Sequence, residues 1–287
     1  MIYRRAASPL HAARAAAGSA YCAALAAVAL IADHPVMLAA VLVAEVCAAS
    51  AAGAGRQLRR AALLTAPFAL AIAVINPIVT RDGLTVILRG GEVPWLGNLD
   101  ITLEATAYGG VLALRAVALV FAGALYASAV DPDEVLRLFR RVSFRSALTA
   151  ALATRMVPVL ARDAGRLAEA QRCRPAGTAP RLAVVRATAA NALDRAIDVA
   201  ATLELRGYGS ARRAPRAHRP WSRHDLAFAA AAVALVALAV AGELTGMTHF
   251  GTYPRFEIAT GPGLFAIATA IVACALAPFL DRRGIGR

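Results

Sequence analysis

Six runs of mostly apolar residues divide the chain, and each is close to the length of about 20 helical residues that crosses a bilayer. They cover residues 15–32, 35–52, 61–80, 103–129, 225–248 and 261–280. A long polar insert, 131–223, separates the fourth run from the fifth. The pattern predicts an all-α membrane protein with about six transmembrane helices, four of them in residues 1–130 and two in residues 224–287.

The polar insert itself predicts two or three amphipathic helices. The sequence from Asp131 to Glu134 has the N-cap residue, first-turn proline and capping-box spacing that open a short helix ending near Val142. A second helical pattern runs from Phe144 to about 174, and its apolar half, 147–161, suits either a membrane crossing or a helix at the membrane surface.

After a proline-containing break at 175–180, a third helical pattern covers residues 181–206. It has one apolar stripe, spaced by three and four residues, and we expect this stripe to pack on the preceding helix. The stripe consists of Leu182, Val185, Ala189, Leu193, Ile197, Ala200 and Leu203.

Composition supports a membrane protein, because 59% of the residues are hydrophobic and the mean hydropathy is +0.59. All 31 basic residues are arginine, and 18 of them lie in the insert beside eight acids, so the insert should seek an acidic partner. The arginines lie between spans rather than on one basic face with interleaved aromatic residues, which argues against nucleic-acid binding. The four cysteines lack the spacing of a zinc site or a disulfide framework, and no cofactor is indicated.

The arginines also predict the topology. Arginine is concentrated before the first run, between the second and third runs, and after the sixth, so the positive-inside rule places both termini and the insert in the cytoplasm. This predicts a multi-pass protein of the plasma membrane, embedded in the lipid bilayer.

Four polar residues within the predicted spans are candidate site residues. Asn76 precedes Pro77, which predicts either a helix kink or a substrate contact. Glu104 and Arg115 are three helical turns apart, so each can face the bundle interior, but they are too distant to pair with each other. Glu45 is a candidate partner for Arg115, whereas snorkelling of Arg115 to the interface is the alternative.

The two long helices of the insert end in similar arginine-containing segments. The first is Ala170-Gln171-Arg172-Cys173-Arg174, and the second runs from Leu203 through Arg206 and Gly207 to Gly209. A proline or glycine then stops the helix and leaves the guanidinium group projecting, which favours docking of a partner.

These segments, in their order and spacing, carry a family resemblance over nearly the whole chain. The chain resembles the transmembrane T component of energy-coupling factor (ECF) transporters, the cobalt-permease-like subunit family. The matching segments are Ile75-Asn76-Pro77, Ile101 to Ala105, Tyr108-Gly109, Leu114-Arg115, Asp131-Pro132, Arg155 to Pro158, Ala170 to Arg172, and Leu203 to Gly209.

The resemblance implies a coupling subunit that joins two ABC-type ATPase subunits to a separate substrate-binding membrane subunit for uptake of a vitamin or metal ion. It also implies that Arg174 and Arg206 correspond to the arginines of the family's two Ala-Arg-Gly motifs, at the ends of two crossed cytoplasmic coupling helices. The chain departs from this pattern, since Pro175 replaces the first glycine and Leu205 replaces the second alanine. Proline cannot supply the left-handed cap of a helix, which weakens the first correspondence more than the second.

Two other classes of protein fit the sequence less well. A self-contained secondary transporter should show two related halves, whereas four spans and two spans show no repeat. A membrane-embedded transferase or phosphatase needs a cluster of carboxylates or histidines, and the five histidines are scattered. The chain also lacks a GxxxxGK[ST] motif, so we expect ATP hydrolysis in partner subunits and no enzymatic activity here.

Overall fold

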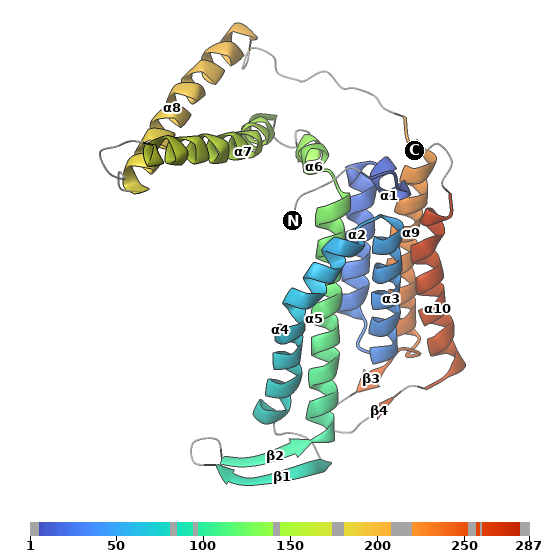
Figure 1. Ribbon diagram of the computed structural model, residues 1–287. Helices are drawn as coiled ribbons and strands as arrows, with labels where there is room; N and C mark the ends of the chain where they lie inside the picture. The colour runs from blue at the N-terminus through green and yellow to red at the C-terminus, as the bar shows by residue number, and fades with distance from the viewer. Residues whose placement is uncertain are drawn as a thin grey trace. The chain divides into compact units, whose positions relative to one another are not determined.

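A computed structural model describes residues 6–80, 85–93, 97–139, 144–173, 181–207, 220–251, 257–258 and 260–281. The chain forms two compact units, one comprising Met1–Pro132 with Trp221–Arg287 and the other Asp133–Pro220. The ribbon shows a helical bundle for the first unit and a pair of long helices for the second (Figure 1). We describe each unit in turn.

The first unit contains the apolar helices. They are α2 (Ala15–Ile31), α3 (Pro35–Ala51), α4 (Gly55–Val79), α5 (Leu103–Ala129), α9 (Arg223–Leu244) and α10 (Pro262–Leu276), with a short α1 (Pro9–Ala12) before them and a 3-10 turn, η1 (Ala277–Phe279), after them. By length and composition, α4, α5, α9 and α10 with η1 are able to span a membrane, and α2 and α3 are shorter apolar helices of 17 residues each. The prediction of an all-α membrane protein is confirmed.

The core of the bundle lies around α2, which packs against α5 and α9, while α3 packs against α5 and α10. Alanine supplies many of the buried side chains, and small side chains let apolar helices approach closely. Three aromatic rings close one end of this core: Phe228 lies 5.2 Å from Tyr21 and 5.3 Å from Phe279, both edge-to-face. The Tyr21 hydroxyl donates to the carbonyl of Ala275 at 2.9 Å, so the ring cluster also joins α2 to α10.

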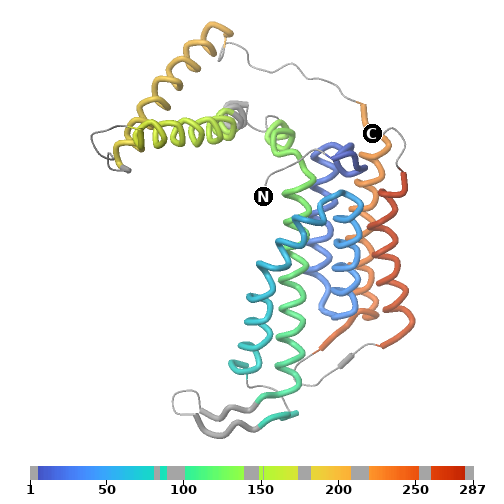
Figure 2. The backbone as a smooth tube through the Cα atoms, in the orientation of Figure 1, coloured from blue at the N-terminus to red at the C-terminus, as the bar shows by residue number. Residues whose placement is uncertain are grey.

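Helix α4 is the least enclosed of the apolar helices. It packs mainly against α5, beside which it runs in both views (Figures 1 and 2). The close approach is at Gly109 of α5, where a Cβ atom would lie 3.0 Å from the Cβ of Asn76 and 3.4 Å from Pro77. A larger residue than glycine would require the Asn76-Pro77 segment to shift by a few tenths of an ångström at this crossing.

Two short antiparallel hairpins connect helices at one end of the bundle. Strand β1 (Val86–Val93) pairs with β2 (Gly97–Thr102) between α4 and α5, and β3 (Phe250–Gly251) pairs with β4 (Glu257–Ile258) between α9 and α10. The pattern of apolar runs predicts no strands in these two segments. Their strands are short and pair only within each hairpin, so they leave the helical architecture unchanged.

The second unit consists of α6 (Pro132–Phe139), α7 (Phe144–Arg172) and α8 (Arg181–Leu205). The three helices begin where the sequence predicts, and α8 ends one residue before its predicted end. The predicted ends of α6 and α7, near Val142 and 174, lie outside the described residues. Helices α7 and α8 pack on each other. Although α7 is 29 residues long, it is not among the described helices that are apolar enough to span a membrane.

Candidate functional site

The end of α8 presents an exposed arginine. The helix ends at Leu205, which is 89% exposed, and the exposed Arg206 follows. The amide of Gly207 donates to the carbonyl of Glu204 at 2.9 Å, and Gly207 has a φ of 75°, in the left-handed region. This backbone conformation is the common glycine cap of a helix, so the chain leaves α8 immediately after the arginine.

The end of α7 has the first arginine-containing segment. Arg172 is the last residue of the helix, and both Arg172 and Cys173 are exposed. Arg174, which the resemblance matches to the first motif, lies outside the described residues.

The prediction that the apolar stripe of α8 packs on α7 is wrong. Four of its five large members are exposed by more than half: Leu182, Val185, Leu193 and Ile197 have exposed fractions of 67%, 62%, 65% and 61%, whereas Leu203 is half-buried. The α8 residues near α7 instead include Asn191 and Arg195. Helical spacing identified an apolar face correctly, but the face has no cover within the part of the chain that the structure describes.

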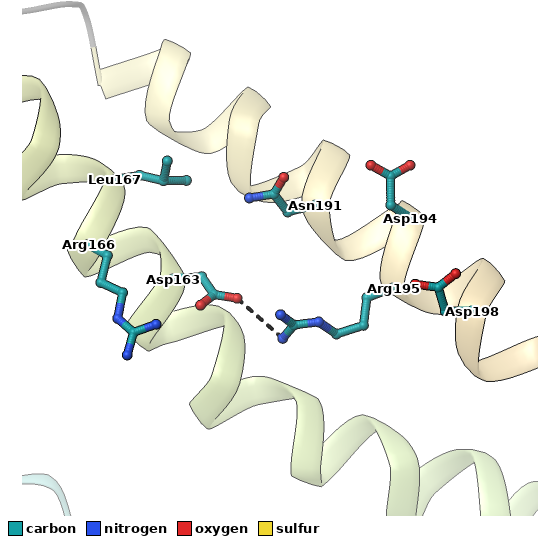
Figure 3. A pocket seen from close by; sticks show the side chains of 7 residues that line it. All are labelled: Asp163, Arg166, Leu167, Asn191, Asp194, Arg195 and Asp198. Atoms are coloured by element: carbon teal, nitrogen blue, oxygen red, sulfur yellow. Dashed lines mark ion pairs between the residues drawn. The ribbon is translucent and has the colours of Figure 1, made fainter. Parts of the chain in front are cut away.

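Polar side chains gather where α7 and α8 cross. Asp163 of α7 and Arg195 of α8 form an ion pair across the crossing, with Nη1 and Oδ2 3.3 Å apart (Figure 3). An open depression of about 410 Å³ lies beside this pair. It is lined by Asp163, Arg166, Leu167, Asn191, Asp194, Arg195 and Asp198. The sequence places Asp194 and Asp198 one turn apart on a helix, but spacing along one helix does not reveal that Asp163 of another helix faces them.

Arg115 caps the carboxyl end of α2. Its Nε donates to the carbonyl of Ala29 at 3.2 Å, and one Nη donates to the carbonyl of Ala32 at 2.9 Å and to Asp33 at 2.6 Å. These carbonyls belong to the last turn, where the helix offers no amide partner and its dipole favours a cation.

The predicted pairing of Arg115 with Glu45 does not occur. Glu45 of α3 is fully buried, and neither carboxylate oxygen has a hydrogen-bond partner in the described part of the chain. The end of α2 supplies backbone acceptors at Ala29 and Ala32, and a search for opposite charges could not find them.

Glu104 and Asn76 have local partners. Glu104, at 2% exposure, accepts from the backbone amide of Thr85 at 3.1 Å, which ties the segment before β1 to the start of α5. The side chain of Asn76 accepts from the Thr80 hydroxyl at 3.2 Å. These contacts give both Glu104 and Asn76 a role in the local fold of the first unit.

Asp225 is a buried polar residue that sequence analysis did not single out. One oxygen accepts from the amide of Arg14 at 2.7 Å and the other from the amide of Ser222 at 2.8 Å, while the Ser222 hydroxyl accepts from the Asp225 amide. The Arg14 guanidinium group also lies 3.3 Å from Asp225 and 5.7 Å above the Trp221 ring. This cluster joins the starts of α2 and α9, and the Ser-x-x-Asp spacing before an apolar run was its sequence signal.

The bundle of apolar helices with a separate unit of long amphipathic helices defines a polytopic α-helical membrane protein. Within this class, the family model of the cobalt transport protein, CbiQ, matches residues 6–217, and the chain belongs to this family. This is the family of ECF transporter T components, so the resemblance drawn from the sequence is confirmed. The chain is therefore a membrane component of a cobalt or ECF-type transport system.

The matched range includes α1 to α8, and thus both arginine-containing helix ends. Among curated proteins, a search finds no match to the chain.

Proposed function

We propose that this protein is the coupling subunit of an ECF-type importer. It transmits ATP-driven motion from a pair of ATPase subunits to a separate membrane subunit that binds the solute, a vitamin or a metal ion. The observation that carries the proposal is the end of α8, where Leu205 and Arg206 are exposed and Gly207 turns the chain away. Family membership makes ATPase and substrate-binding components the expected partners.

The distribution of charge supports a cytoplasmic position for the helical insert. Arg14, Arg56, Arg59, Arg60 and Arg223 lie at the end of the bundle that holds α1 and η1, close to the starts of α2, α4 and α9. The hairpin end instead carries acids, including Asp33, Glu92, Asp100 and Glu243. By the positive-inside rule the arginine-rich end faces the cytoplasm of a plasma-membrane protein, and both connections to the insert, at 132 and 221, leave the bundle at that end.

Arg206 is the proposed ATPase contact on α8, and by resemblance Arg174 is the contact at the end of α7. A guanidinium group has a planar fork that holds a carboxylate through two hydrogen bonds, which suits an exposed helix end that must transmit force. Truncating one partner of a buried pair of this kind costs about 2–5 kcal/mol, because the other charge stays buried and unpaired.

Co-purification of the ATPase pair tests this assignment. Arg206→Ala should abolish transport and strongly weaken complex assembly while the bundle stays folded, and Arg206→Lys should restore it poorly because an ammonium lacks the fork. Arg174→Ala should have the same effect less completely. Arg186→Ala is the matched control, since Arg186 is also exposed on α8 but lies five turns from the tip. Wild-type retention of the ATPase pair by the Arg174→Ala, Arg206→Ala double variant would refute the assignment.

The exposed apolar stripe of α8 is the proposed contact for the substrate-binding membrane subunit. A contiguous apolar face on a helix that carries charged residues elsewhere marks an interaction surface rather than a solvated one. A photo-crosslinker at Leu193 should capture that subunit, whereas a crosslinker at Asp198, on the polar side of the same helix, should not. Equal capture at the two positions would contradict the proposed surface.

A further inference from the structure

Each residue of the ion pair at the crossing of α7 and α8 has a residue of opposite charge nearby on its own helix. Asp163 has Arg166 three residues further along α7, and Arg195 has Asp198 three residues further along α8. Residues three apart lie on neighbouring positions of a helix surface and can pair. In the observed arrangement Asp163 and Arg195 point toward each other, while Arg166 points away from α8 (Figure 3).

We propose that Asp163 and Arg195 form an exchangeable ionic latch that positions α8 against α7. When the two helices shift, Asp163 pairs with Arg166 and Arg195 pairs with Asp198, so that the crossing opens without leaving a charge unpaired. This inference rests on the proposed coupling function and adds to it the residues that set the position of the Arg206 end relative to α7.

Exposure of the pair suits a contact that must break and re-form. The side chain of Arg195 is 43% exposed and that of Asp163 is 19% exposed, and the open depression gives solvent access to both. Ion pairs that are this accessible shift an equilibrium by no more than about fivefold. Such a pair selects one arrangement of two helices without preventing the other.

Apolar packing at the crossing is limited, which leaves the polar residues to define the position. Four large side chains of the α8 stripe, Leu182, Val185, Leu193 and Ile197, are exposed, and the depression at the crossing is lined by six polar or charged residues and Leu167. A crossing between well-packed apolar ridges would instead resist sliding.

Removing the replacement partners tests the latch. In the double variant Arg166→Gln, Asp198→Asn, the ion pair between the helices remains, but neither charge has another partner on its own helix. The shift of α8 against α7 should therefore be hindered. The matched control is Arg162→Gln with Asp194→Asn. It removes the same charges from the same helices, and it relieves the same like-charge pairs one turn apart. Arg162 and Asp194 are the sequence neighbours of Asp163 and Arg195, so they lack the spacing of three residues that lets Arg166 and Asp198 pair with them.

The movement is measurable between the ends of the two helices. Cys173 is exposed at the end of α7 and Thr202 is exposed near the end of α8, so spin labels at Cys173 and at Thr202→Cys report their separation. The other three cysteines are replaced by alanine. Distances are recorded by double electron–electron resonance in the full complex in lipid nanodiscs, without nucleotide and with AMP-PNP.

The wild type and the control pair should show a nucleotide-dependent shift in distance. Arg166→Gln with Asp198→Asn should reduce that shift by at least about half and lower transport by severalfold, with ATPase subunits still bound. Asp163→Asn with Arg195→Gln should broaden the distance distribution already without nucleotide.

Exchanging the two charges distinguishes an exchangeable ion pair from an ion pair that only holds the two helices in one position. Asp163→Arg with Arg195→Asp keeps a cross-helix pair but places like charges three residues apart on both helices, so the latch should lock and transport should fall. Adding Arg166→Asp and Asp198→Arg should restore both the shift and transport.

If the simple exchange behaves as wild type, or the Arg166→Gln, Asp198→Asn variant behaves as its control, the latch is overturned while the coupling function stands. If the assembled wild-type complex shows no nucleotide-dependent shift, the coupling function is overturned and the latch with it.

Discussion

Arg115 should contribute strongly to the stability of the bundle. Its three hydrogen bonds have different surroundings, so their contributions to the free energy of unfolding can be estimated separately. Arg115→Met keeps the length and apolar stem of the side chain but removes every donor. Ala29 and Ala32 are 0% and 1% exposed, so water cannot replace the lost donors at their carbonyls. Hydrogen bonds from a charged donor contribute about 1.5–3 kcal/mol each, and an acceptor left unsatisfied costs about 1–3 kcal/mol.

The third contact should contribute much less. The Asp33 side chain is 60% exposed, and exposed ion pairs contribute about 0–1 kcal/mol. We therefore expect Arg115→Met to lower the stability by about 2–5 kcal/mol and Asp33→Asn by less than about 1 kcal/mol. Arg115→Lys should fall between them, because an ammonium group retains the charge at the helix end but not the three directed bonds.

Thermal unfolding in detergent with a thiol-reactive fluorophore measures this series. Cys22 is buried at 3% exposure and reacts only when the bundle opens. The half-buried Cys47 and Cys274 and the exposed Cys173 are replaced by alanine in every variant, including the reference protein. ATPase co-purification should be reduced only in proportion to the folded protein. If Asp33→Asn destabilises as much as Arg115→Met, the ion pair rather than the capped carbonyls holds the arginine; if Arg115→Met unfolds at the wild-type temperature, the reasoning fails altogether.

Three further predictions use the same assay. Gly109→Ala should destabilise by about 1–3 kcal/mol, since its Cβ would lie 3.0 Å from that of Asn76, whereas Gly110→Ala, which meets no atom within 4 Å, should be neutral or stabilising. Glu45→Met should raise the unfolding temperature by the equivalent of about 1–3 kcal/mol, because it removes a buried carboxyl group without a described partner, and a lower temperature would contradict this. Asp225→Asn should cost about 1–3 kcal/mol by weakening the contacts between the starts of α2 and α9, and an unchanged midpoint would show that packing alone holds them.

The spans were predictable from sequence because a bilayer demands long apolar segments, and this demand does not depend on which helices become neighbours. The partners of intramembrane polar residues were not predictable, because they do depend on which helices become neighbours. Arg115 could be placed inside the bundle from its sequence position, yet its acceptors are backbone carbonyls of α2, and a carbonyl leaves no mark in the sequence. Searching for an opposite charge led to Glu45, which lies on α3 without such a contact.

The end of α8 was predictable because its signals are local. Gly207 after an amphipathic pattern indicates a left-handed cap, and the structure has that backbone conformation. The crossing with α7 depends on residues more than 25 positions apart, such as Asp163 and Arg195, so no local pattern could identify it.

The apolar stripe of α8 could be predicted from the sequence, but the surface that covers it could not. A period of 3.6 residues establishes that one face of a helix is apolar, but it does not identify what covers that face. The assignment to α7 assumed that the chain buries its own apolar surfaces, whereas Leu193 and Ile197 stay exposed while a polar contact joins the two helices. An exposed apolar face of this kind is the surface that the proposed coupling function would use for a membrane subunit, and capture by a crosslinker at Leu193 but not at Asp198 would support that use.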